Sequence, residues 1–263
     1  MVFGYRCVKN TAKGRSVKIV VVIPARYGSS RFEAKVLANK TGKYLVQHSY
    51  ERALLARGVT GVIIATDDDR VLQACKSFGA PCVMTSAAHQ SGTDRIAEAV
   101  QNIPADIVVN LQADEPEIDP ANIEKVAGLL VRDAGAEMAT LIAPFESAEQ
   151  VANPNIVKCV TDVHGRALYF SRSPVPYNRQ AGGVGGSVKG YWRHLGIYAY
   201  RKSFLMKFTQ LAPSFLETTE KLEQLRALEN GFTILTAKVD RVWDGVDTPE
   251  QYEEFVKRFL NQK

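Results

Sequence analysis

The segment IPARYGSSRFEAK, residues 23–35, concentrates positive charge in the turn after an unbroken apolar run. Arg26, Arg31 and Lys35 lie there among small residues. Guanidinium and ammonium groups, with the backbone N–H groups of a small-residue turn, are well suited to binding phosphate oxygens. We therefore expect this turn to bind a polyphosphate.

Two acidic segments also follow predicted strands: TDDD at residues 66–69 and QADEP at residues 112–116. A carboxylate at a strand end beside a polyphosphate suits Mg²⁺, which shares the phosphate oxygens. Acidic clusters such as DEPEID, residues 114–119, seldom serve packing, so we expect this one to have a functional role. A nucleoside triphosphate with Mg²⁺ is the simplest common ligand.

Short β-branched runs alternate with helical patterns, which is typical of parallel βαβ units. The predicted strands are residues 18–23, 61–65, 81–84, 107–111, 137–143, 156–161, 167–171, 195–200 and 233–239, with 156–161 and 167–171 forming a hairpin. The predicted helices are residues 43–57, 69–78, 94–101 with Thr93 as N-cap, 120–133, 217–229, and a last helix starting at Pro249 behind a Thr248/Gln251 capping box. This order predicts an α/β fold with a mixed, mainly parallel central sheet and helices on both faces. Ligands of such sheets bind beyond the carboxyl ends of the parallel strands, where the three polar clusters fall.

Composition is that of a globular protein, with 46% hydrophobic and 23% charged residues in 263. No apolar run is long enough to span a membrane, and the N-terminus lacks a signal-peptide core, so we expect a cytoplasmic protein without membrane insertion. The four cysteines form no CxxC pair and indicate neither zinc nor disulfides.

The net charge of +5 is concentrated at the N-terminus, where residues 1–18 carry five basic and no acidic side chains. The rest of the chain is formally neutral, which argues against nucleic-acid binding. We predict a basic, poorly ordered tail at 1–17 and a single domain at 18–263, with a smaller antiparallel, dimer-forming subregion at 156–230.

The cationic turn matches neither GxxxxGK[ST] nor GxGxxG, which argues against P-loop ATPases and dinucleotide-dependent dehydrogenases. Several motifs occur in order instead: IPARYGSSRFEAK, ATDD, HQSGTDRIAEA, NLQADEP, NPNIVKCV, ALYFSRSPVPY, RHLGIYAYRKSF, LEQLRALENG and GVDTPEQYE. This set resembles the CMP-Kdo synthetases, the 3-deoxy-manno-octulosonate cytidylyltransferases, from about Lys18 to the C-terminus. The resemblance implies that CTP and a 3-deoxy-octulosonic acid (Kdo) give a CMP-sugar and pyrophosphate for lipopolysaccharide-type glycans. It also implies Mg²⁺ dependence, a homodimer and the nucleotide-diphospho-sugar transferase fold.

The same resemblance assigns roles to individual residues. It places Arg26 and Lys35 at the triphosphate and as catalytic groups, and Asp114 and Asp247 as metal ligands and catalytic groups. Nucleotide contacts fall to Pro24 and Ala25 through the backbone, and to Ser91, Gly92 and Gln112. The sugar-binding set is Arg172, His194, Tyr198, Glu223 and Gln224.

The cationic turn departs from the family pattern. Glu33 and Ala34 stand where proline and glycine are usual, Val36 replaces a usual proline, and Ala113 replaces a usual glycine. An added Cβ obstructs a backbone with positive φ or a close approach to phosphate, so Ala34 and Ala113 bear directly on CTP affinity.

Simpler interpretations stay open for several residues. Asp247 could serve only the dipole of the following helix, and Asp67 to Asp69 could be only an N-cap cluster. Glu223 and Gln224 could belong to an exposed charged helix face, and His194 could be a satisfied core histidine.

Alternative functions stay open as well. The 8-amino analogue of Kdo is a second candidate substrate, and sialic acid a less favoured one. A catalytically silent nucleotide-binding protein of the same fold is the candidate from another class.

Overall fold

The computed structural model describes residues 11–12, 15–28, 31–240, 242 and 245–261. The chain forms two compact units, one made of residues 1–124 and 243–263 and the other of residues 125–242. Of the predicted tail at 1–17, residues 1–10 and 13–14 lie outside the described residues. β1 (Thr11–Ala12) and β2 (Arg15–Ser16) form a short antiparallel ladder.

The first unit is built on a parallel sheet with the strand order β6-β3-β4-β5. Its strands are β3 (Ile19–Pro24), β4 (Val59–Thr66), β5 (Cys82–Met84) and β6 (Ile107–Asn110). Residues 19–23 of β3 and all of β6 are buried, as expected for parallel strands covered on both faces.

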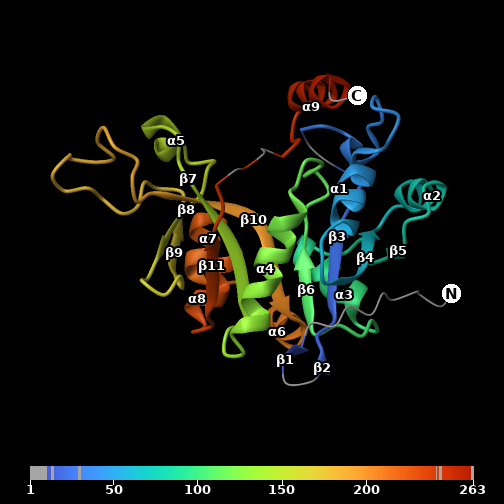
Figure 1. Cartoon of the computed structure of the whole chain (residues 1–263), viewed down its shortest axis with the longest axis horizontal. Helices are drawn as coiled ribbons and strands as arrows, with labels where there is room; N and C mark the ends of the chain where they lie inside the picture. The colour runs from blue at the N-terminus through green and yellow to red at the C-terminus, as the bar shows by residue number, and fades with distance from the viewer. Residues whose placement is uncertain (1–10, 13–14, 29–30, 241, 243–244, 262–263) are drawn as a thin grey trace. The chain divides into compact units, whose positions relative to one another are not determined.

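Helices α1 (Leu45–Leu54), α2 (Asp69–Ser77) and α3 (Gly92–Val100) connect these strands and pack around them (Figure 1). The chain moves from β3 outward to β4 and β5, and then returns to β6 on the other side of β3. Right-handed crossovers therefore put α3 on the face opposite α1 and α2. The strand order reverses between β3 and β6, which makes their carboxyl ends the expected ligand site.

The C-terminal helix α9 (Pro249–Asn261) belongs to this unit. The predicted capping box is confirmed: Gln251 N–H donates to Thr248 Oγ1 at 3.3 Å, and Thr248 N–H donates to Gln251 Oε1 at 3.0 Å. α9 packs its apolar face into a cluster formed by Leu45, Val246, Tyr252, Phe255 and Val256. This packing fixes the start of α9, where Asp247 lies.

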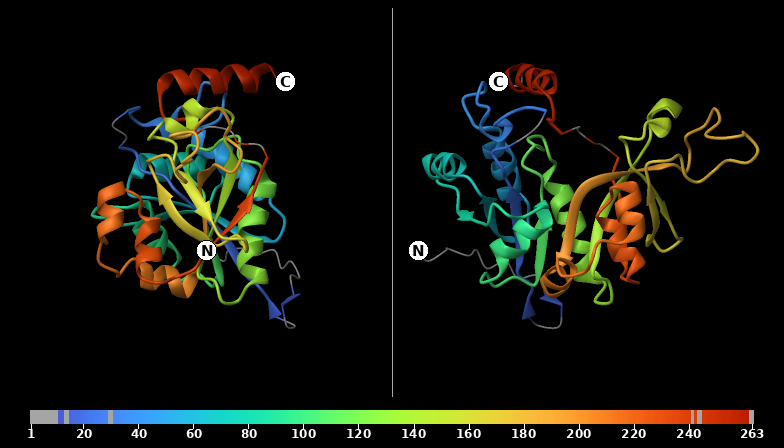
Figure 2. Two further views of the ribbon diagram at one scale, coloured as in Figure 1. Left: turned by 90° about the vertical axis from the view of Figure 1, so that its left-hand side faces the viewer. Right: turned by 180° about the vertical axis from the view of Figure 1, so that it is seen from behind.

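The second unit contains an antiparallel pair, β7 (Met138–Pro144) and β10 (Trp192–Arg201), with β11 (Ile234–Lys238) parallel to β7. The predicted hairpin is confirmed as β8 (Lys158–Thr161) and β9 (Ala167–Ser171). The loop of residues 177–190 extends away from these strands, as Figures 1 and 2 show in orange.

The remaining helices are α4 (Pro120–Arg132), which runs from the first unit into the second, and α5 (Ala148–Ala152), α6 (Lys202–Phe208), α7 (Phe215–Glu220) and α8 (Gln224–Glu229) in the second. The mixed, mainly parallel α/β class is confirmed. No helix in the described ranges has both the length and the apolar character needed to cross a membrane.

Two predicted details are wrong. The helix predicted at 217–229 is broken into α7 and α8 by Lys221, which adopts a left-handed conformation with φ 55°. The Arg226 guanidinium on α8 donates two hydrogen bonds, of 2.5 and 2.7 Å, to the Glu217 carboxylate on α7 and so links the two helices. The N-cap of α3 is Ser91, not Thr93, because Ser91 Oγ accepts from Asp94 N–H at 3.1 Å. Helices α5 and α6 and the 3₁₀ turn η1 (Lys35–Leu37) were not predicted.

Candidate active site

Lys35 lies between two carboxylates beyond the β3 and β6 strand ends. Its Nζ donates to Asp114 Oδ2 at 2.6 Å and to Asp247 Oδ1 at 2.8 Å. The Lys35 side chain is only 13% exposed. The structure therefore brings together three of the predicted catalytic residues, one from each of three distant segments.

Backbone contacts hold the two acidic residues in place. Val246 N–H donates to Asp114 O at 2.8 Å, and Asp247 N–H donates to Gln251 Oε1 at 2.8 Å. Arg31 Nη2 lies 3.1 Å from Asp247 Oδ1. Burial acts to raise the pKa of Asp247, but hydrogen bonds and charge from Lys35 and Arg31 hold it below its ordinary value. Asp247 is thus a carboxylate at neutral pH, and besides preceding α9 it contacts Lys35 and Arg31.

Asp114 and Asp247 fit a Mg²⁺ ion. Both carboxylates already contact one cationic group, the Lys35 ammonium, which marks a cation position between them. Among the described residues no cluster of three or more His, Cys, Asp or Glu side chains could hold a metal. Mg²⁺ does not need one, because it commonly takes one or two carboxylates and completes its shell with water and phosphate oxygens.

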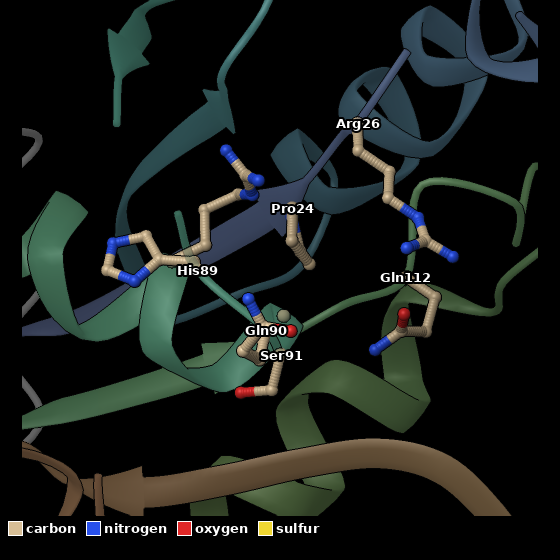
Figure 3. Close-up of a pocket in the computed structure, with 8 residues that line it drawn as sticks. Pro24, Arg26, His89, Gln90, Ser91 and Gln112 are labelled. Carbon is tan, nitrogen blue, oxygen red and sulfur yellow. The ribbon is translucent and has the colours of Figure 1, made fainter. Parts of the chain in front are cut away.

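Two pockets meet at the strand ends. One is lined by Pro24, Arg26, Gly28, Arg31, Lys35, Val36, Gln112, Ala113, Asp114 and Asp247. The other, of about 270 Å³, is lined by Pro24, Arg26, His89, Gln90, Ser91, Gly92, Arg95 and Gln112. Pro24, Arg26 and Gln112 line both pockets, so the two pockets are adjacent and share part of their walls. Figure 3 shows the Arg26 side chain extending toward Gln112, across from Gln90 and Ser91.

Arg26 is an exposed cation at the junction of the two pockets, and no described residue pairs with it. Ala25 has a different environment: it is fully buried, and its N–H donates to Ala65 O at 2.8 Å. The Ala25 N–H is therefore already used within the sheet, and the predicted backbone contact of Ala25 with the nucleotide stays a prediction.

The conformations at the two replaced glycines differ. Ala34 has φ 52° and ψ 25°, in the left-handed region that favours glycine. Ala113 is not among the described residues with positive φ, and it is 5% exposed. Of these two alanines, only Ala34 therefore adopts a backbone conformation that is unfavourable for a residue with a Cβ.

The segment after β5 supplies pocket residues that the sequence analysis did not assign. His89 hydrogen-bonds Glu98, and the Arg95 guanidinium donates to Asp67 Oδ2 and Thr85 Oγ1, both at 2.6 Å. The motif HQSGTDR contained both His89 and Arg95, so the signal was present. Asp68 is the N-cap of α2, as the simpler interpretation of the acidic cluster held.

The predicted sugar-binding residues lie in the second unit. The His194 ring is 5.2 Å from Tyr198 and 5.0 Å from Phe170, and its Nε2 lies 3.1 Å from Thr140 Oγ1. Desolvation by the surrounding protein lowers the pKa of His194 to about 3. His194 is therefore neutral at physiological pH, and it presents a polar ring beside a tyrosine.

Gln224 and Arg172 differ in hydrogen bonding. Gln224 is 4% exposed, and its Nε2 is buried without a hydrogen-bond partner. An unpaired buried donor is costly and marks a position where a ligand oxygen would be favoured. Arg172 instead donates to backbone carbonyls, including Glu220 O at 2.6 Å and Pro154 O at 3.0 Å.

The same unit contains a buried lysine that was not predicted. Lys158 has no exposed surface, and its Nζ donates to Asn153 O at 3.0 Å and Ile156 O at 2.8 Å. Desolvation lowers its pKa. Lys158 and Arg172 thus both donate to backbone carbonyls of the segment of residues 153–156.

Comparison with known proteins gives consistent matches. A protein-family model described as cytidylyltransferase matches residues 20–236. The chain is 46% identical to a 3-deoxy-manno-octulosonate cytidylyltransferase from Geotalea daltonii, over 94% of this chain and all of that protein. It is 48% identical to a protein of the same name from Geobacter metallireducens, over 92% and 98%.

A solved structure of CMP:2-keto-3-deoxy-manno-octonic acid synthetase complexed with CTP matches with a TM-score of 0.88 and 44% identity, over 94% of this chain and all of that chain. A cytidylyltransferase structure from Leptospira borgpetersenii, 18% identical with a TM-score of 0.63, shares the fold.

Proposed function

Because the chain belongs to the cytidylyltransferase family, we propose that it activates 3-deoxy-manno-octulosonic acid with CTP, giving CMP-Kdo and pyrophosphate for lipopolysaccharide-type glycans. The observation that carries this proposal is the likeness, over nearly the whole chain, to a synthetase solved with CTP. The cationic turn and the paired carboxylates at the switch point provide the groups that the reaction needs.

In the proposed reaction the anomeric hydroxyl oxygen of the sugar attacks the α-phosphorus of CTP in line. The bond from that phosphorus to the β-phosphate oxygen breaks, pyrophosphate leaves, and the hydroxyl proton passes to solvent. Lys35 and Arg26 bind the phosphates and stabilise the charge of the departing pyrophosphate. Asp114 and Asp247 would hold Mg²⁺, which would neutralise phosphate charge and lower the pKa of the attacking hydroxyl.

The nucleoside is proposed to lie in the second pocket, against Ser91, Gly92 and Gln112. Gln112 Nε2 donates to Asn110 Oδ1 at 2.9 Å, which leaves Gln112 Oε1 as the acceptor for the ligand. Pro24 is placed at the junction of both pockets, and a Cβ at Gly92 would lie 3.6 Å from its Cγ.

The sugar acid is proposed to bind His194, Tyr198, Glu223 and Gln224, with Arg172 and Lys158 holding the neighbouring segment. The unpaired Nε2 of Gln224 supports a role in binding a sugar oxygen. Glu223 Oε1 lies 3.9 Å from Arg226 Nη2, and Glu223 is close enough to Tyr198 to act on it electrostatically. The 8-amino analogue of Kdo stays the second candidate substrate.

We also propose a homodimer formed through the second unit. Phe215, Tyr177 and Leu168 are 75%, 69% and 58% exposed within the predicted subregion at 156–230. Exposed aromatic side chains of this kind are enriched in protein interfaces.

We propose a cytoplasmic location as well. Three cysteines among the described residues, Cys75, Cys82 and Cys159, are free thiols, which agrees with a reducing compartment.

Pyrophosphate release tests the proposed activity. CTP and Mg²⁺ are supplied with Kdo, with its 8-amino analogue, and with sialic acid in separate reactions. We expect pyrophosphate release only with Kdo, or faster with Kdo than with the other two sugars. Faster release with the 8-amino analogue would identify that sugar as the substrate instead. Binding of CTP without pyrophosphate release in any of the three reactions would identify a silent nucleotide-binding protein instead.

A further inference from the structure

The position of Lys35 suggests that its ammonium has two different partners during the reaction. Lys35 Nζ contacts both proposed metal ligands, at 2.6 and 2.8 Å. The proposed function also requires Lys35 at the triphosphate. A single ammonium cannot stay between the two carboxylates while Mg²⁺ is bound by both of them.

We propose that Lys35 is a built-in counter-ion that excludes divalent metal from the Asp114–Asp247 site until a nucleotide triphosphate arrives. The proposal rests on the proposed function, because that function makes Asp114 and Asp247 the metal ligands. It adds that metal and nucleotide binding are coupled through one side chain, which exchanges carboxylate partners for phosphate partners.

Charge balance supports this coupling. Without nucleotide, Lys35 and Arg31 offset the charges of Asp114 and Asp247, so a divalent ion alone would add uncompensated positive charge. Lys35 is only 13% exposed, and the low local dielectric strengthens its attraction to the two acids. A triphosphate supplies the negative charge that both the metal and the released ammonium need.

The local structure permits the exchange. Lys35 lines the same pocket as Arg26 and Gly28, in the proposed phosphate region. A lysine ammonium sits on a flexible four-carbon stem with three donors, so a change of rotamer moves it without moving the backbone. The 3₁₀ turn η1 that carries Lys35 can therefore stay fixed while the ammonium turns to the phosphates.

Mn²⁺ binding to the nucleotide-free protein tests the proposal, with electron paramagnetic resonance of free Mn²⁺ as the readout. We expect weak binding to the wild type and binding at least tenfold tighter to Lys35→Met, in which the carboxylates have lost their internal cation. Lys35→Arg keeps the charge and should stay weak. Adding Asp114→Asn to Lys35→Met should remove the gain, which locates the bound ion.

Arg31→Met is the matched control. Arg31 is 66% exposed and reaches Asp247 at 3.1 Å, so its loss should tighten Mn²⁺ binding by less than about threefold. Lys35→Gln serves if Lys35→Met fails to fold, as judged by thermal melting. Equal Mn²⁺ affinity in the wild type and the neutral Lys35 variant would overturn the proposal.

The outcome can be separated from that of the proposed function. A tenfold gain of Mn²⁺ affinity, with no pyrophosphate released from CTP in the presence of any of the sugars, would support the counter-ion role and contradict the proposed activity. Pyrophosphate release by the wild type with no gain in the neutral variant would do the reverse.

Discussion

Asp247 Oδ1 lies 2.8 Å from Lys35 Nζ, although 212 positions of sequence separate the two residues. Lys35 follows the first strand of the sheet, and Asp247 precedes the last helix of the chain. The C-terminal helix therefore completes a site whose other parts come from the first half of the sequence, and loss of its anchoring would disrupt the site as well as the fold.

Asp247→Asn should lower turnover roughly hundredfold, because a neutral amide is a poor Mg²⁺ ligand and the negative charge on the phosphates in the transition state is then stabilised less. Stability should change little, since Lys35 keeps Asp114 as a partner. Steady-state pyrophosphate release and thermal melting measure the two effects. Glu250→Gln is the control: it changes an exposed acid three positions along the chain and should leave turnover intact.

Ala34→Gly should stabilise the protein by about 1 kcal/mol, because φ 52° is unfavourable for any residue with a Cβ. The same change at buried Ala113, which lies outside the positive-φ residues of the described chain, should destabilise it by about 0.5–1 kcal/mol. Urea denaturation of both variants decides the matter. Equal signs for the two substitutions would contradict the assigned backbone conformations.

Gln224→Met should raise the KM for the sugar acid at least tenfold and leave the KM for CTP unchanged. It should also stabilise the unliganded protein by about 1 kcal/mol, because it removes a buried donor that has no partner. Kinetics with each substrate varied, and urea denaturation, test the two parts. Gln210→Met, at an exposed glutamine, is the matched control and should alter neither quantity. Lower stability with an unchanged sugar KM would assign Gln224 to packing alone.

His194 should make folding stability depend on pH below neutrality. Desolvation lowers its folded-state pKa to about 3 from the ordinary 6.5, so the unfolded chain takes up a proton first as the pH falls. The stability contributed by neutral His194 is complete above pH 6.5 and is lost at up to about 1.4 kcal/mol per pH unit below it.

Comparison with His194→Gln isolates this effect from the carboxylates. Between pH 7.5 and pH 5 the wild type should lose about 1–2 kcal/mol more unfolding free energy than the variant. Parallel pH dependence of the two proteins in urea denaturation would mean that His194 is protonated normally in the folded state.

The sequence was sufficient to predict the parallel strands and the turns that carry function. Buried apolar runs such as residues 19–23 are long and sharply bounded, and polar clusters at their ends must lie at one edge of the sheet. Family resemblance then supplied Asp247, which strand patterns alone could not have associated with Asp114. The convergence of both acids on Lys35 was not predictable, because it depends on packing between distant segments.

Other differences have local causes. The apolar and charged periodicity of residues 217–229 continues through Lys221, so the pattern could not show a single left-handed residue that starts a second helix. The resemblance assigned Arg172 to the sugar, and the structure adds that its guanidinium donates to carbonyls of two backbone segments, which no sequence pattern indicated. Residue type specifies what an arginine can bind, whereas the fold decides which acceptors reach it.

Phosphorus NMR of CTP, Mg²⁺ and Kdo incubated with the protein tests the central claim most directly. The claim predicts that the CTP resonances decline while a pyrophosphate and a phosphodiester resonance grow, with one molecule of each product formed per CTP consumed. Asp114→Asn should suppress both products. Inorganic phosphate and CDP as the products, or equal turnover without Kdo, would contradict it.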